Sequence, residues 1–137
     1  MNVTKSDIEQ YLSDVFAAVN AGRYQISPRQ KNQDIYMDYV FTEEDAKEVI
    51  LSLTAYDFSD AVQNDHPQHP EEILYIFGKD INLMPRYGDS EEKVSLYIKF
   101  NKLTNQYVIV ISFHKQEYPL TYKFILLILN TLSTRNM

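Results

Sequence analysis

Two segments in the second half of the chain, Val94–Phe100 and Tyr107–His114, have the clearest strand pattern in this sequence. Each alternates apolar side chains with others at a period of two residues, which is typical of a β-strand with one buried face. The short polar stretch Asn101–Gln106 joins them. The sequence therefore predicts an antiparallel β-hairpin with one apolar face and one polar face.

The apolar face of the hairpin follows from the parity of the two strands. The first strand would bury Val94, Leu96, Ile98 and Phe100. The second strand would bury Ile109, Ile111 and Phe113. For these sets to share a face, each even-numbered residue must pair with an odd-numbered one. A two-residue turn at Thr104-Asn105 or a four-residue turn satisfies this condition, and the two-residue turn places Tyr97 opposite Ser112 and Ser95 opposite His114.

The polar face of the second strand would then carry Val108, Val110, Ser112 and His114. Either turn length also puts Tyr97 and Lys99 of the first strand on this face. Because opposed residues lie ~5 Å apart, one phosphodiester group could touch several of these side chains. Histidine can transfer a proton near neutral pH, lysine supplies positive charge, and tyrosine donates a hydrogen bond or stacks on a base. RNA brings its own nucleophile, the 2′-hydroxyl, so this chemistry needs neither a metal nor a protein nucleophile.

The first half of the chain has the spacing of amphipathic helices. Its first helix would bury one face made of Ile8, Tyr11, Leu12, Val15, Phe16 and Val19. Thr4 or Ser6 can begin this helix and Gly22 can end it. A short second helix is expected within residues 29–39. A third begins at Thr42, and its buried face would hold Ala46, Val49, Ile50 and Leu53.

After a predicted helical turn at Tyr56–Val62 and a polar loop over residues 63–71, the period changes to that of strands. Ile73–Lys79 is expected to form a strand and residues 82–92 a loop. Helices followed by strands predict an α+β fold, with N-terminal helices packed on a mostly antiparallel sheet of three or more strands. The 137 residues suit a single domain, with a helical half over about 1–62, a sheet half over about 73–124 and a tail over 125–137. The segment 121–132 could be a short helix or an added strand.

Charge divides the chain into two parts. Residues 1–92 hold 7 Lys/Arg and 18 Asp/Glu, a net charge of −11, whereas residues 93–137 hold 6 Lys/Arg and 1 Asp/Glu, a net charge of +5. An acidic protein of net charge −6 can therefore still present a local anion-binding surface. The chain has no cysteine, which excludes disulfides, thiolate zinc sites and a cysteine nucleophile and fits a reducing cytoplasm. Its longest apolar run, Phe124–Leu129, is too short to span a bilayer.

Other motifs argue against several classes of site. Asp65, His66 and His69 could bind zinc, but the neighbouring prolines favour a solvated loop, so no metal is predicted. Ser112 lacks the Gly-x-Ser-x-Gly elbow of the serine hydrolases. With three glycines in all, the chain has no glycine-rich phosphate loop.

Several stretches of the chain resemble the motility quorum-sensing regulator (MqsR) family of toxins, and its Gram-positive branch especially. They keep the family's order and spacing over roughly residues 5–124. In the helical half they are VNAG at Val19–Gly22 and VILSLTxxDF at Val49–Phe58. In the sheet half they are Phe77–Lys79, Leu96–Lys99, Val110–His114 and Glu117–Tyr122.

The resemblance implies a RelE-like fold and a metal-independent endoribonuclease, without cofactor, that cleaves mRNA and arrests growth. It implies as partner an antitoxin, usually a DNA-binding helix-turn-helix protein, that holds the toxin inactive. The chain itself is then expected in the cytoplasm, bound to RNA and to its antitoxin but neither to DNA nor to a membrane.

The resemblance also assigns residues. The family's active-site tyrosine falls on Tyr97 and its nearby strand lysine on Lys99. The basic residue of its C-terminal strand falls on His114, where the best-known members carry lysine. The family's basic residue after Asp-Phe is replaced by Ser59-Asp60, and we expect Lys79 to take its place in space. Contacts to the RNA are expected from Lys93, Ser112 and Lys115.

Two interpretations therefore stay open. The first is an mRNA-cleaving toxin with a catalytic set of Tyr97, Lys79, Lys99 and His114. The second is a non-catalytic protein-binding module related to the toxin fold, which would bind a partner through its acidic helices.

Overall fold

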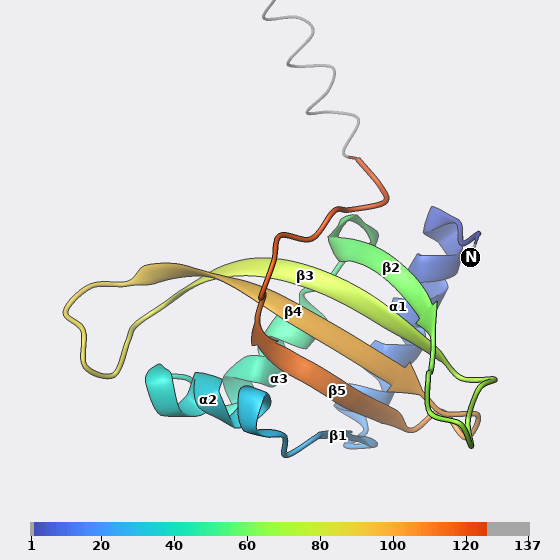
Figure 1. The fold of residues 1–137 in the computed structure, drawn as a ribbon, viewed down its shortest axis with the longest axis horizontal. Coiled ribbons are helices and arrows are strands. Elements are labelled where there is room, and N and C mark those ends of the chain that lie inside the picture. Colours follow the sequence, from blue (N-terminus) through green and yellow to red (C-terminus); the bar gives the residue numbers. More distant parts are fainter. Residues whose placement is uncertain (1, 126–137) are drawn as a thin grey trace, which may run out of the picture.

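A five-stranded sheet and three α-helices make up residues 2–125, the part of the chain that the computed structural model describes (Figure 1). The helices are α1 (Lys5–Asn20), α2 (Gln30–Asp38) and α3 (Glu43–Leu51), with one 3₁₀ turn, η1 (Ala55–Asp57). The strands are β1 (Tyr24–Ile26), β2 (Phe58–Gln63), β3 (Ile73–Leu83), β4 (Glu92–Lys102) and β5 (Val108–Lys115). No helix in this part of the chain has the length and apolar character needed to cross a membrane.

The strands lie in the order β1-β5-β4-β3-β2. The short β1 runs parallel to β5, and all other neighbours are antiparallel. The predicted α+β class with a mostly antiparallel sheet is therefore confirmed. The segment expected as the helical half, 1–62, also contributes β1 and most of β2, which are the two edges of the sheet.

The first helix begins and ends where its sequence predicts. Thr4 caps it: the Thr4 hydroxyl accepts a bond from the Asp7 amide, and the Asp7 carboxylate accepts one from the Thr4 amide. Gly22 follows the helix with a φ of +72°, a conformation that costs glycine little. Thr42 caps α3 in the same way, through Asp45.

The core lies between the sheet and the helices α1 and α3, which cover the same face of it (Figure 1). Tyr11 of α1 stacks on Tyr75 of β3 with ring centroids 3.9 Å apart. Phe77 contacts the rings of Phe58 and Phe100 edge-on. Alternate residues of β3 and β4 thus face the helices, and the residues between them form the outer face of the sheet.

The turn of the β4–β5 hairpin differs from both predicted lengths. Leu103 donates its amide to the Tyr107 carbonyl, which closes a three-residue loop over 104–106. Gln106 has a φ of 70°, as the last residue of such a loop requires. A three-residue loop pairs even-numbered residues with each other, so that Phe100 lies opposite Val110.

Near the turn, therefore, the predicted faces of β5 are reversed. Val108 and Val110, expected on the polar face, are fully buried in the core. Ile109 and Ile111, expected in the core, are half-buried on the outer face. The predicted hairpin pairs are also wrong, because Tyr97 lies opposite His114 and Lys99 opposite Ser112.

A β-bulge at Ile111 restores the predicted faces beyond this point. The register shifts between Lys99 and Phe100, so one extra residue of β5 is accommodated there. Phe113 returns to the core, where it is fully buried. Ser112 and His114 consequently share the outer face with Lys99 and Tyr97, as the sequence predicts.

The buried side chain of Asn32, from α2, holds this bulge. Its amide nitrogen donates to the Ile111 carbonyl at 3.0 Å and to the Ser27 carbonyl at 2.9 Å. Its amide oxygen accepts from the Phe113 amide at 2.8 Å. Asn32 thus pairs backbone groups of β5 at the bulge, beyond the end of the short β1.

The segment expected as a helical turn, Tyr56–Val62, contains the strand β2 instead. Only η1 is helical there, and β2 pairs with β3. A register shift between Phe58 and Asp60 places the buried residues Phe58 and Ala61 three positions apart. That spacing imitates a helix, which explains the wrong prediction.

The chain after β5 crosses the outer face of the sheet, where it packs on Gly78 (Figure 1). A Cβ on Gly78 would lie 2.3 Å from the Tyr122 hydroxyl and 2.9 Å from Leu120. The crossing is fastened by hydrogen bonds from Gln116 to the Leu96 carbonyl and from Ser59 to the Thr121 carbonyl. Most of the tail predicted over 125–137 lies outside the described residues.

Replacement of Asn32 by alanine should destabilise the protein. The substitution leaves the Phe113 amide unpaired in a buried place, so the free energy of unfolding should fall by about 2–4 kcal/mol in urea titrations. Gln33→Ala, at an exposed position of the same helix, is the control. Equal losses in the two variants would contradict the role of Asn32.

Replacement of Gln106 by glycine should stabilise the protein. Because glycine adopts a positive φ without steric cost, the free energy of unfolding should rise by about 0.5–1 kcal/mol. Gln106→Ala keeps the Cβ and is the control, with no gain expected. Urea denaturation of both variants checks the prediction, and a gain in the alanine variant would contradict it.

Candidate active site

A cavity of about 170 Å³ opens on the outer face of the sheet where β4, β5 and the start of α2 meet. Its lining is polar and aromatic: Arg29, Lys31, Tyr97, Lys99, Ser112, His114, Glu117 and Tyr118. Four of the seven predicted site residues, Tyr97, Lys99, Ser112 and His114, thus line one cavity. The bulge at Ile111 makes this possible, since it returns Ser112 and His114 to the face of β4 that carries Tyr97 and Lys99.

The rings of Tyr97 and His114 stack across the strands, with centroids 5.3 Å apart and planes 15° apart. The Nδ1 atom of His114 lies 2.8 Å from the Lys115 carbonyl oxygen. Because a carbonyl can only accept, Nδ1 carries the hydrogen in this bond. The neutral ring therefore has Nε2 as its basic nitrogen, and it is held in place by both contacts.

Lys99 and Arg29 supply positive charge beside the histidine. Lys99 of β4 lies opposite Ser112 of β5 in the sheet, and Ser112 is almost fully buried. The Arg29 guanidinium contacts the Ser112 hydroxyl at 3.4 Å and the Ile111 carbonyl at 3.5 Å. Within residues 2–125, neither cation forms an ion pair with a carboxylate, so both can bind an anion.

Burial lowers the pKa of Lys99, and the Arg29 guanidinium lowers it further, against the opposing effect of the Asp65 carboxylate. Burial raises the pKa of Tyr97, so its phenol stays protonated at neutral pH. Tyr97 can therefore donate a hydrogen bond or stack, but it is not a base. Among the lining side chains, His114 offers in Nε2 a nitrogen that can accept a proton.

The rim of the cavity carries a mixed charge. Lys31 forms an ion pair with Glu117, and both side chains are more than half exposed. Tyr118 is also exposed beside Tyr97 and contributes to the raised pKa of that residue. With three cationic side chains and one carboxylate, the lining favours an anionic ligand.

Three predicted residues lie elsewhere. Lys79 pairs with Leu96, so it projects from the helix-covered face of the sheet, and it binds the Asp57 carboxylate at 3.4 Å. Lys93 lies far along β4 and binds Asp80 at 3.2 Å. Lys115 projects from the other side of β5 and stands over the Tyr39 ring, and it lines a neighbouring cavity of about 200 Å³ that His114 also lines.

Parity explains the positions of Lys79 and Lys115, whereas Lys93 is on the same face as Tyr97 but too far along β4 to line the cavity. A strand alternates its side chains, so Lys79 and Lys115 fall on the opposite face from Tyr97 and His114. The expectation that Lys79 replaces the basic residue missing at Ser59-Asp60 is wrong for the same reason. Asp60 is exposed, and its carboxylate adds slightly to the raised pKa of Tyr97.

Sequence reasoning missed Arg29, Lys31, Glu117 and Tyr118. Arg29 directly precedes α2 and Lys31 lies in its first turn, about 80 residues from β5 in the sequence. No local pattern links them to the hairpin. The Ser27-Pro28 pair can start a helix, and Arg29 and Lys31 come directly after it. This pattern was the available indication that basic residues lie at a helix start.

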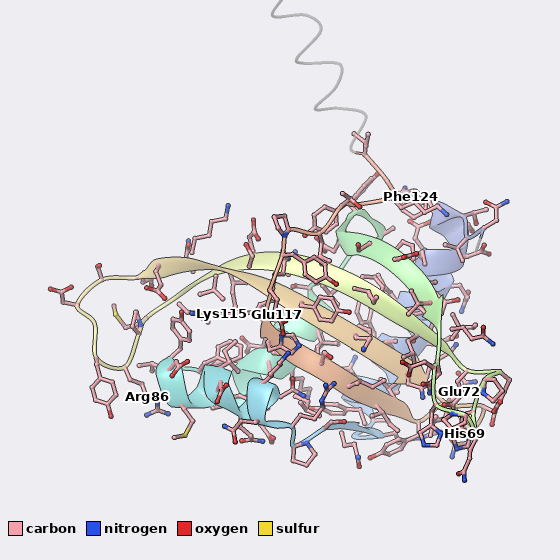
Figure 2. All side chains as sticks on the ribbon, viewed as in Figure 1. His69, Glu72, Arg86, Lys115, Glu117 and Phe124 are labelled. Carbon is pink, nitrogen blue, oxygen red and sulfur yellow. The ribbon has the colours of Figure 1, made fainter. Side chains whose placement is uncertain are left out.

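A second cluster of potential metal ligands lies at the other end of β5 from Lys115 and Glu117 (Figure 2). It consists of His69, Glu71 and Glu72, with one ligand atom from each within 4.8 Å of the others. Asp65 and His66 of the considered zinc set are not part of it. The Glu72 carboxylate accepts bonds from the amides of Asn64 and Asn101, which gives it a structural role between the β2–β3 loop and β4.

Comparison of the chain with protein-family models finds no matching family, and comparison with curated proteins finds no match.

Proposed function

We propose that this protein is an endoribonuclease that cleaves mRNA by means of the RNA's own 2′-hydroxyl group. The supporting observation is the single cavity that holds His114, Lys99, Arg29 and Tyr97 together. A base, two cations and an aromatic hydrogen-bond donor are the groups that such a reaction requires. The resemblance to the MqsR toxins supports the same reaction.

In this proposal the cations bind the scissile phosphate. Arg29 offers a planar fork of N–H donors, which matches two phosphate oxygens, and Lys99 adds a charge that is partly shielded from water. The charge on the phosphate oxygens grows in the transition state, so these contacts strengthen as the reaction proceeds. Tyr97 orients the ribose or stacks on a base.

The chemical step begins at His114. Its Nε2 accepts the proton of the 2′-hydroxyl, and the 2′ oxygen attacks phosphorus. The bond from phosphorus to the 5′ oxygen then breaks, and the leaving oxygen takes a proton from the Lys99 ammonium. The lowered pKa of Lys99 makes it a stronger acid than an ordinary lysine. The products are a 2′,3′-cyclic phosphate and a free 5′-hydroxyl, and water returns the proton from His114 to Lys99.

The biological setting proposed is that of a toxin in a type II toxin-antitoxin pair with a RelE-like fold. It would act in the cytoplasm, where its mRNA substrate is, and an antitoxin protein would restrain it. The alternative, a non-catalytic binding module, predicts neither RNA cleavage nor growth arrest.

Replacement of His114 by glutamine should lower the cleavage rate by about 10²–10⁴-fold, the usual contribution of a general base. The measurement is cleavage of an RNA oligonucleotide in the presence of EDTA, with detection of 2′,3′-cyclic phosphate ends. Growth and mRNA integrity after induction in cells give the parallel result.

Lys79→Gln is the matched control, because Lys79 lies on the opposite face and should leave the rate within about twofold of wild type. Equal activity of wild type and His114→Gln would remove His114 from the chemistry. Absence of cleavage and of toxicity in the wild type would favour the binding module.

Replacement of Lys99 by methionine tests its role as the acid. The variant should be slow on ordinary RNA, by about 10²-fold or more. The loss should be clearly smaller on RNA with sulfur in place of the 5′ bridging oxygen, since a thiolate leaves without a proton and only the phosphate contact of Lys99 is then missing. An equal loss on both substrates would assign Lys99 to phosphate binding alone.

The affinity for uncleavable 2′-O-methyl RNA should fall as pH rises, and the fall should begin below the pH at which an ordinary lysine titrates. The sign follows from the lowered pKa of Lys99, whose charge is present below that pKa and lost above it. Lys99→Arg should keep its affinity over the same range in fluorescence anisotropy titrations. Parallel pH profiles for the two proteins would contradict the prediction.

A further inference from the structure

Exposed apolar side chains gather where the tip of the β3–β4 hairpin meets the end of α2. Within residues 2–125, seven large hydrophobic residues are exposed. Four of them belong to this region, namely Met37, Val40, Met84 and Tyr87. Tyr87 is the most extreme, with 98% of its surface exposed.

Backbone contacts fix these residues relative to one another. Val40 donates its amide to the Met84 carbonyl at 2.9 Å. The Arg86 amide donates to the Asp38 carbonyl at 2.9 Å, and its guanidinium donates to the Tyr36 carbonyl at 2.8 Å. Figure 2 shows Arg86 at the hairpin tip beside α2. The apolar patch is therefore part of the ordered fold.

The patch continues into a groove of about 430 Å³ between α3 and the hairpin. Val40 and Met84 belong to both the patch and the groove. Val49 of α3 and Ile81 of β3 extend the apolar lining. An open apolar surface of this kind is typical of a site that binds another protein.

The charge on the groove identifies the kind of partner. Its charged lining residues are Asp45, Glu48 and Glu91, and no basic side chain of the described residues lines it. A second copy of this chain would bring the same carboxylates together, which electrostatic repulsion opposes. A segment with Lys or Arg beside its apolar row would complement both the floor and the rim.

We propose that this groove and patch bind a partner protein through an amphipathic segment flanked by basic residues. The lining of the groove shares no residue with the cavity that holds His114. A partner bound here would therefore leave the cavity open. The interaction does not depend on RNA cleavage, so each proposal can fail without the other.

The test uses three short synthetic peptides and the full chain. The first has leucines at helical spacing and lysines elsewhere, the second has glutamate in place of lysine, and the third is a scrambled version of the first. The first should shift the amide NMR signals of residues 40–41, 48–52 and 81–84. The other two should bind at least about tenfold more weakly, because they lack the charge or the apolar row.

Variants of the chain locate the interaction. The double variant Val40→Ser/Met84→Ser should lose about tenfold in affinity for the first peptide, since it removes apolar contacts. Glu48→Gln/Glu91→Gln should weaken binding and reduce its dependence on salt. Tyr118→Ser and Glu9→Gln remove an exposed aromatic ring and a carboxylate elsewhere, and both should bind as wild type does.

Several results would overturn the proposal. One is absence of binding, and another is a set of NMR shifts outside the groove. Equal binding of the scrambled peptide would show attraction by charge alone. A dimer seen in sedimentation and lost in Val40→Ser/Met84→Ser would identify a second copy as the occupant.

Discussion

The amide of Asn32 determines the register of the strand that carries the candidate site. It is the only side chain in the described residues that pairs backbone groups on both sides of the bulge, at Ile111 and Phe113. A bulge leaves backbone groups without ladder partners, and an unpaired buried group is costly. A buried asparagine can donate and accept at once, which neither aspartate nor leucine can do. The site on β5 thus depends on a residue of α2.

The same contact joins the fold to the proposed chemistry. The three-residue loop of the hairpin, with Gln106 at positive φ, would by itself place Ser112 and His114 in the core. The bulge reverses this over one residue, so that Phe113 is buried and His114 stacks on Tyr97. Arg29 directly precedes α2, so the contact that positions Asn32 against β5 also positions Arg29. The Arg29 guanidinium then completes the cationic lining of the cavity. The contact of Asn32 with β5 therefore determines both where the site residues of β5 lie and which cation joins them.

Local patterns were enough to predict the helices, the long strands and the outer-face set of Tyr97, Lys99, Ser112 and His114. They did not predict the structure correctly where one extra residue interrupts the alternation of side chains along a strand. The bulge at Ser59 made a strand look helical. The three-residue loop of the β4–β5 hairpin reversed the faces of residues 108–111, and the bulge at Ile111 restored the predicted faces beyond them. Arg29 is brought to the cavity by a contact between residues distant in the sequence, for which a single sequence holds no local signal. Lys79 and Lys115 project from the other face of the sheet because strand parity decides the face, and parity was not applied to these two residues.

The division of charge along the chain has a spatial counterpart. The basic half, residues 93–137, contributes Lys99 and His114 to the cavity. The other two cations that line it, Arg29 and Lys31, belong to the acidic half, residues 1–92. Acidic side chains of that half line the groove beside α3, through Asp45 and Glu48, and also a second cavity beside His114, through Asp34 and Asp38. The carboxylates of the groove would repel a nucleic acid backbone from that surface. With RNA as the proposed substrate, this repulsion would keep the polyanion off the groove, which would stay available to the proposed basic partner.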